Sequence, residues 1–196
     1  MNRLITGLLV TATMVAPLMA AALKPNDKAP DFSAKASLAG KEMDFSLKTA
    51  LKKGPVVVYF YPSAFTGGCN IEAHTFAENK EKFDAAGASI IGVSRDSIMR
   101  LNAFSADPQY CAGKIAVASD PNGAIATSYG LTAMTGIKPG MKDSRGVEID
   151  HEFTERTTFI VTPDGKIAAT LASADDKISP ADHVMKSLEA IQKLHK

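Results

Sequence analysis

A short apolar run, followed by a loop rich in proline and glycine and then by a cysteine, constrains this chain more than any other feature. Residues 56–61 are all apolar or aromatic and are bounded by Pro55 and Pro62, which is typical of a strand buried on both faces of a sheet. Beyond Cys69 the apolar residues recur at helical spacing, and the charged residues from Glu72 to Lys82 mostly fall on other faces. A cysteine in the first turn of a helix lies near unpaired backbone N–H groups and the positive end of the helix dipole, which favours the thiolate. We therefore expect Cys69 to be reactive.

The first 22 residues have the pattern of a secretory signal peptide. Arg3 supplies a positive charge, residues 4–16 are almost entirely apolar, and residues 17–22 end in three alanines. Cleavage after Ala22 or after Ala20 fits this pattern. The alternative is a membrane anchor, but the apolar run is shorter than the roughly 20 residues that span a bilayer. We expect residues 1–22 to be removed, residues 23–196 to form a single domain, and the mature protein to be exported, to the periplasm, without membrane association.

Charge and composition exclude several classes of function. Without Arg3 the basic and acidic residues balance, so the chain shows no electrostatic pattern for nucleic acid or an anionic membrane. The four histidines, at positions 74, 151, 183 and 195, have no metal-ligand spacing, and no glycine-rich phosphate loop is present. Met134 and Met141 are interpreted as packing residues. We expect no metal and no cofactor.

The order of the remaining elements predicts an α/β fold. A hairpin (32–38 and 41–45), a brief helix capped by Ser46, and the central strand precede the helix of Cys69. Strands at 88–94 and 115–118 follow, and a helix capped by Asp96 or Ser97 separates them. After the second of these strands we expect a short helix (124–129), a loop (130–152), a hairpin (156–161 and 166–171) and a final helix from Ser179. This order predicts a mixed sheet with helices on both faces, in which the central strand and the next two are parallel. Cys69 then lies beyond the carboxyl end of a central strand, where α/β sheets place their chemistry.

Pro62, Thr66 and Cys69 form the motif P-x-x-x-T-x-x-C, with Glu72 three residues later and Arg156 opening a distant hairpin. In these residues the chain resembles the peroxiredoxins, the alkyl hydroperoxide reductase/thiol-specific antioxidant family, closest to the bacterioferritin-comigratory or Q-type group. The resemblance covers essentially the whole mature chain and implies a thioredoxin-like fold. It also implies a thiol-dependent peroxidase that reduces hydrogen peroxide and organic hydroperoxides.

The resemblance assigns a role to each of these residues. Cys69 would attack the peroxide and become a sulfenic acid. Arg156 would keep Cys69 ionised and stabilise charge on the departing oxygen. The Thr66 hydroxyl would hold a peroxide oxygen, Pro62 would shield the thiolate from water, and Glu72 would orient Arg156.

The second cysteine, Cys111, is the candidate resolving residue within the chain. Many Q-type relatives carry that cysteine five residues after the first, where this chain has His74. The helix over 96–106 should carry the chain away from the active end of the sheet, so we expect Cys111 near the opposite end. To reach Cys69, the 107–114 loop must double back, the chain must unfold locally, or a partner chain must supply the thiol. The alternative is that an external thiol resolves Cys69.

Other functions on the same fold are less consistent with these residues. A thiol–disulfide oxidoreductase usually needs C-x-x-C, and Thr66 and Glu72 occupy the two positions where the second cysteine would stand. A copper chaperone needs a second nearby cysteine, and a domain that had lost its activity should lack Thr66 or Arg156. We expect the partners to be a peroxide and a thioredoxin-like or small-thiol reductant, and the protein to be a monomer or dimer.

Overall fold

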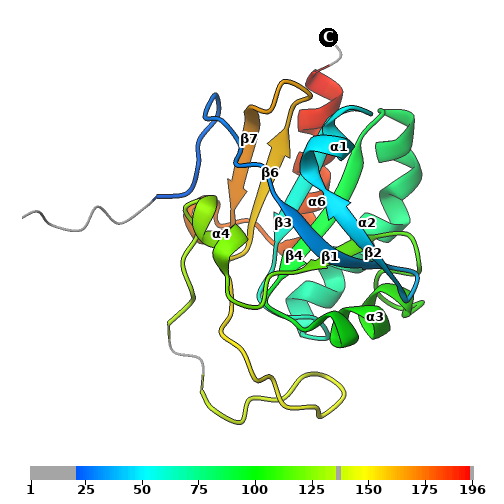
Figure 1. The fold of residues 1–196 in the computed structure, drawn as a ribbon, viewed down its shortest axis with the longest axis vertical. Coiled ribbons are helices and arrows are strands. Elements are labelled where there is room, and N and C mark those ends of the chain that lie inside the picture. Colours follow the sequence, from blue (N-terminus) through cyan, green and yellow to red (C-terminus); the bar gives the residue numbers. More distant parts are fainter. Residues whose placement is uncertain (1–20, 136–137, 195–196) are drawn as a thin grey trace, which may run out of the picture.

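The computed structural model describes residues 21–135 and 138–194 (Figure 1). Most of the expected signal peptide, residues 1–20, therefore lies outside the described residues. The strands are β1 (Ser33–Leu38), β2 (Lys41–Ser46), β3 (Val56–Phe60), β4 (Ser89–Ser94), β5 (Ala116–Ser119), β6 (Thr157–Val161) and β7 (Ile167–Ala172). The helices are α1 (Leu47–Leu51), α2 (Gly67–Ala85), α3 (Ile98–Ala106), α4 (Ala124–Ser128), α5 (Ser173–Asp176) and α6 (Pro180–Lys193).

The seven strands form one sheet in the order β2-β1-β5-β4-β3-β6-β7. β3, β4 and β5 are parallel to one another, and β6 pairs antiparallel with β3, so the predicted mixed sheet is confirmed. The sequence did not indicate that the first hairpin would join this sheet, which it does through the antiparallel pairing of β1 with β5.

Side chains of the central strand alternate between two apolar layers. Val57 and Tyr59 face the layer that contains α2, α3 and α6, whereas Val56, Val58 and Phe60 face the layer formed with α1, α4 and the amino-terminal arm. Figure 1 shows α4 in front of the sheet and α6 behind it. Because successive side chains of a strand point to opposite faces, helices on both sides are needed to bury a strand with no polar residue, and β3 is completely buried.

Element ends agree closely with local sequence signals. Ser46, Ser97 and Ser179 cap α1, α3 and α6, and Ser179 with Asp182 forms a capping box ahead of Pro180. α2 begins at Gly67, two residues before the cysteine, and β5 is displaced by one residue from the expected strand. The four-residue α5 was not predicted, because it is too short to show a period.

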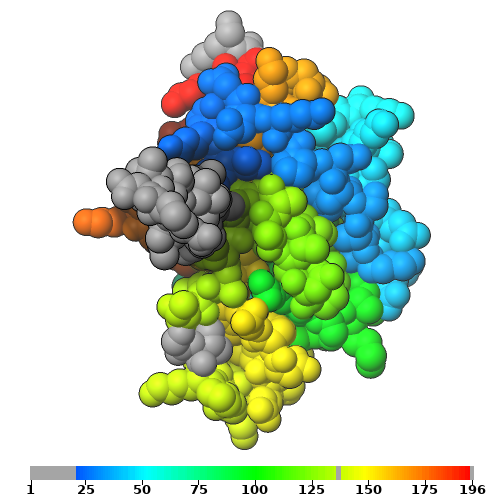
Figure 2. Space-filling view, turned by 60° about the vertical axis from the view of Figure 1, so that its left-hand side comes forward, coloured from blue at the N-terminus to red at the C-terminus, as the bar shows by residue number. Residues whose placement is uncertain are grey.

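The long connection from α4 to β6 contains no helix or strand over its described residues, as expected. It holds only isolated bridges, Ala133 with Thr154 and Lys142 with Glu148. In Figure 1 it hangs below the sheet, and in Figure 2 the yellow-green to yellow part forms a lobe at the bottom of the molecule. This is the end of the sheet where β3 and β4 terminate. No helix of the described residues is long and apolar enough to cross a bilayer.

Candidate active site

Cys69 lies in the first turn of α2, directly beyond the carboxyl end of β3. Thr66 is the N-cap, with extended φ and ψ of −110° and 150°, and Cys69 is the third helical residue. Its side chain is 2% exposed. The glycine directly before it matters for packing, because a Cβ on Gly68 would lie 3.2 Å from both Nη2 of Arg156 and Cγ of Pro180. The backbone N–H groups of the first turn, which have no partner within a helix, are the local donors for an anionic sulfur.

Arg156 joins Cys69 to Glu72. Its Nη2 donates to Cys69 Sγ at 3.2 Å, and its Nη1 forms an ion pair with Glu72 Oε2. The residue precedes β6, whose first residue Thr157 pairs with Phe60 at the end of β3, so the antiparallel register brings Arg156 to the cysteine. Burial opposes the charge of the guanidinium, but Glu72 and Cys69 raise the pKa of Arg156 above its ordinary value.

Glu72 is completely buried, and the expectation that it would lie mainly on the polar face of its helix was wrong. Because Arg156 occupies the buried side of α2, the carboxyl turns inward to meet it. Burial raises the pKa of Glu72 to about 7, with the nearby guanidinium of Arg156 acting in the opposite direction. Its second oxygen, Oε1, has no hydrogen-bond partner among the described residues. The predicted orienting contact with Arg156 is present.

Thr66 and Pro62 belong to the loop that precedes Cys69. The Thr66 hydroxyl donates to the carbonyl oxygen of Ser63 at 2.8 Å. A hydroxyl whose hydrogen is engaged in this way still has lone pairs that can accept a hydrogen bond from a peroxide O–H. Pro62 and Thr66 are both half-buried. Phe65, the residue of this loop directly before Thr66, adopts a positive φ of +61°.

Cys111 lies much closer to the active end of the sheet than expected. It is completely buried and belongs to the same apolar cluster as Cys69. The 107–114 loop doubles back, so that the ring of Tyr110 lies 5.6 Å from that of Phe65 and 5.5 Å from that of Phe104. Both cysteines are free thiols in the structure. Burial, with Asp107 as a smaller influence, raises the pKa of Cys111.

A set of buried charges behind the loop was missed by the sequence reasoning. Asp96, expected only as one of two possible helix caps, points inward instead, and Ser97 caps α3. Its carboxylate accepts from His151, and Arg100 joins it to Asp143. No local sequence pattern predicts this cluster of charges, because its members come from three separate segments of the chain.

Comparisons with known proteins settle the family. Residues 25–170 match the model of the AhpC/TSA family. The chain belongs to this family. Peroxiredoxin Bcp of Xanthomonas campestris is 31% identical over 137 residues, which is 70% of this chain and 76% of that protein. The plant peroxiredoxin Q of Sedum lineare is 28% identical over 144 residues, 73% of this chain and 66% of that protein.

Solved structures agree with this assignment. The crystal structure of peroxidoxin BcpB from Mycobacterium tuberculosis has a TM-score of 0.71 at 25% identity, covering 89% of this chain and 99% of that one. The bacterioferritin comigratory protein of Xanthomonas campestris, solved for its alkyl peroxide reduction activity, has a TM-score of 0.63 at 28% identity, covering 83% and 92%. The thioredoxin-like fold predicted from the sequence is confirmed. This peroxiredoxin is a thiol peroxidase, and the thiol–disulfide oxidoreductase alternative is not favoured.

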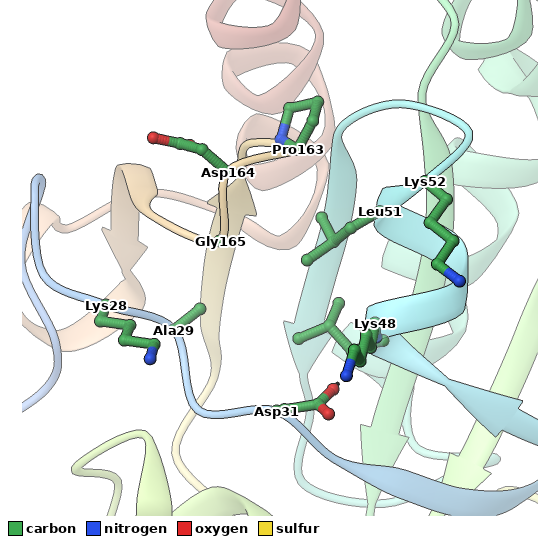
Figure 3. Close-up of a pocket in the computed structure, with 10 residues that line it drawn as sticks. Lys28, Ala29, Asp31, Lys48, Leu51, Lys52, Pro163, Asp164 and Gly165 are labelled. Atoms are coloured by element: carbon green, nitrogen blue, oxygen red, sulfur yellow. Dashed lines mark hydrogen bonds between the residues drawn. The ribbon is translucent and has the colours of Figure 1, made fainter.

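Two hollows in the surface differ in where they lie relative to Cys69 and its partner Arg156. One, of 460 Å³, is shown in Figure 3 between Lys28, Lys48 and the Pro163–Gly165 turn. It lies at the amino end of β3, away from Cys69. The other, of 540 Å³, lies beside Arg156 and is lined in part by Met134. Met134 and Met141, interpreted from the sequence as packing residues, are both exposed. Among the described residues, no cluster of His, Cys, Asp and Glu could hold a metal ion.

Proposed function

We propose that Cys69 is the residue of this peroxiredoxin that reduces peroxides. The contact that carries this assignment is the fork of Arg156, with one guanidinium nitrogen on Cys69 Sγ and the other on the buried Glu72. A fixed positive charge 3.2 Å from the sulfur stabilises a thiolate, the only nucleophilic form of cysteine. The positive end of the α2 dipole, in whose first turn Cys69 lies, favours the thiolate as well.

The proposed reaction begins when the Cys69 thiolate attacks one oxygen of the peroxide. An S–O bond forms as the O–O bond breaks, and the second oxygen leaves as water or an alcohol after taking up a proton. Arg156 stabilises the charge that develops on that departing oxygen. Thr66, whose hydrogen is held by the Ser63 carbonyl, accepts the peroxide O–H and orients it for attack. The sulfur is thereby oxidised to Cys69 sulfenic acid.

Hydrogen peroxide and organic hydroperoxides are the proposed substrates. A relative of similar fold is described for alkyl peroxide reduction. In this chain the hollow beside Arg156 is lined by small and apolar residues, among them Ala172, Ala174 and Met134, and by polar ones, among them Glu155 and Asp175. This hollow gives room for an organic group next to Arg156, the cation that would stabilise the charge on the departing oxygen.

We infer that Cys111 resolves the sulfenic acid. The neighbouring Tyr110 supports this pairing, because its ring lies 5.6 Å from that of Phe65 in the loop before Cys69. The Cys111 sulfur would attack Cys69, an S–S bond would form as the S–O bond breaks, and water would leave. A thioredoxin-like or small-thiol reductant would then reduce the disulfide. Because Cys111 is completely buried and burial raises the pKa of its thiol, the 107–114 loop must open before the bond forms, and disulfide geometry requires Cα atoms within about 7 Å.

Intact mass after one equivalent of hydrogen peroxide tests both assignments in wild type, Cys69→Ser and Cys111→Ser. The proposal expects loss of two hydrogen atoms in wild type and gain of one oxygen in Cys111→Ser. A gain of oxygen already in wild type would assign resolution to an external thiol. Retention of a reduced Cys69 in both wild type and Cys111→Ser would refute the role of Cys69.

We also propose that residues 1–22 direct export and that the mature protein works in the periplasm. The support is the charged, apolar and small-residue pattern of that segment. Amino-terminal sequencing of protein from a periplasmic fraction tests this. A mature terminus after Ala20 or Ala22 is expected, and retention of Met1 on protein in the cytoplasm would contradict it.

A further inference from the structure

The buried carboxylate of Asp96 is the anchor of the loop that carries Thr66. Asp96 follows β4 and is 0% exposed. Its Oδ2 accepts from the backbone N–H of Ala64 at 2.7 Å, and its Oδ1 accepts from the hydroxyl of Ser63 at 3.0 Å. The Ser94 hydroxyl donates to it as well, at 2.6 Å. One side chain, from the segment that follows β4, thus fixes two successive residues of the loop.

A second charged residue holds the same loop from the carbonyl side. Arg100, in α3, forms an ion pair with Asp96 at 2.8 Å and donates through Nη2 to the carbonyl oxygen of Ala64 at 3.0 Å. Both backbone polar groups of Ala64 are therefore satisfied by charged side chains. Arg100 also pairs with Asp143 at 2.7 Å, which connects this anchor to the long lobe between α4 and β6.

The lobe itself contacts the loop at Phe65. The N–H of Ser144 donates to the carbonyl of Phe65 at 2.9 Å, and the Arg145 guanidinium lies 3.3 Å from the centre of the Phe65 ring. His151 Nε2 completes the lobe's contact with Asp96 at 2.9 Å. A non-glycine residue at φ +61° is strained and persists only where its surroundings impose that conformation. These contacts supply that constraint immediately before Thr66.

The loop in turn sets the direction of the Thr66 hydroxyl. The carbonyl of Ser63, the residue that Asp96 holds, accepts the hydrogen of Thr66 Oγ1 at 2.8 Å. A displacement of Ser63 would release this hydrogen and rotate the lone pairs away from the sulfur. The path from Asp96 to the peroxide site therefore contains two hydrogen bonds, one to Ser63 and one from Thr66.

We propose that Asp96 is a positioning residue for peroxide reduction, which holds the 63–66 loop so that the Thr66 hydroxyl accepts the peroxide beside Cys69. This inference rests on the proposed role of Cys69. It concerns the alignment of the peroxide and not the formation of the thiolate, which depends on Arg156 and the α2 amino terminus. Its consequence is a selective effect: loss of the anchor slows reaction with peroxide more than reaction with a reagent that needs no alignment.

The test compares two reactions of Cys69 in a Cys111→Ser background. The rate constant for oxidation by hydrogen peroxide and that for alkylation by iodoacetamide are measured by quenching and intact mass. In Asp96→Asn the peroxide constant should fall about tenfold or more, since small misplacements of reacting groups cost up to about a hundredfold, while alkylation changes by less than about threefold.

Asp120→Asn is the matched control. Asp120 is also buried and also accepts backbone N–H groups, from Ile125 at 3.1 Å and Ala126 at 2.9 Å in α4. Its substitution should leave the ratio of the two rate constants unchanged. An unchanged ratio in Asp96→Asn would overturn the proposal.

Ser63→Ala keeps the proposal testable if Asp96→Asn does not fold, because it leaves every charged group in place and removes only the Ser63 hydroxyl, which contacts the Asp96 carboxylate at 3.0 Å and His151 Nε2 at 3.4 Å. A lower ratio in Ser63→Ala supports the positioning role, and an unchanged ratio overturns it. Failure of the proposed function is a separate result. In that case Cys69 of the otherwise unaltered background would itself react with peroxide no faster than a free thiol.

Discussion

Glu72→Gln should change the pH dependence of stability in a way that reports the burial of this carboxyl. Burial raises the pKa of Glu72 from 4.5 to about 7 in the folded protein. A carboxyl whose pKa is raised on folding contributes fully to stability below its unfolded pKa, and that contribution is lost as the pH rises through the folded pKa. The window is therefore pH 4.5 to about 7.

The size of the effect follows from the width of that window. At ~1.36 kcal/mol per pH unit, wild type should lose about 3 kcal/mol across it relative to the variant, because glutamine does not ionise. The residue is completely buried, so solvent does not reduce this figure appreciably. Above pH 7 the difference between the two proteins should become constant.

Urea unfolding between pH 4.5 and 8.5 measures the difference, in a Cys69→Ser background that removes titration and oxidation of the sulfur. Groups that titrate in both proteins cancel in the comparison. Glu81→Gln, on the same helix but exposed, is the control and should run parallel to its parent. Parallel curves for Glu72→Gln as well would refute the reasoning, because they would mean that Arg156 outweighs burial and keeps the carboxyl ionised throughout.

Three further predictions follow from particular contacts. Thr66→Val should slow oxidation by peroxide about tenfold, the value of one hydrogen bond, with alkylation of Cys69 unchanged; equal slowing of both reactions would contradict the accepting role. Gly92→Ala should lower the free energy of unfolding by about 1–3 kcal/mol, because its Cβ would lie 2.5 Å from a ring carbon of Tyr59; urea unfolding with no loss would contradict this. His183 is buried, and burial, followed by the charge of Arg156, lowers its pKa to about 4, so its contribution to stability should be lost as the pH drops from 6.5 towards 4. His183→Gln should therefore lose less stability than wild type over this range; an equal loss in the thermal unfolding of both proteins would refute it.

Local patterns were sufficient for most of the fold. The strand at 56–60 needed only its own run of apolar residues between two prolines, and α6 needed only Ser179, Pro180 and the spacing of its apolar side chains. The parallel order of β3, β4 and β5 followed from the handedness of the crossovers. The attachment of the first hairpin to β5 did not follow, because its alternating strands could have paired with either edge of a sheet.

The candidate site also has one part that local sequence determines and another that depends on the tertiary structure. Pro62, Thr66 and Cys69 lie within eight residues, so the strand, the loop and the helix start place them together without help from the rest of the chain. Arg156 could be assigned from family resemblance, but its two partners are fixed by the register of β6 on β3. That register also decides the burial of Glu72, which helical periodicity placed on the polar face.

What the sequence determined by itself is therefore the position of Cys69 at a helix amino terminus and the class of sheet, because each depends on interactions between residues close in the chain. The tertiary structure decided the rest. The position of Cys111 depended on the path of the 107–114 loop. The hydrogen bonds that hold the 63–66 loop to Asp96, and Asp96 to His151, depended on how the 138–152 segment folds back. Contacts between segments tens of residues apart are set by packing and buried charge pairing over the whole fold, which no local period or motif encodes.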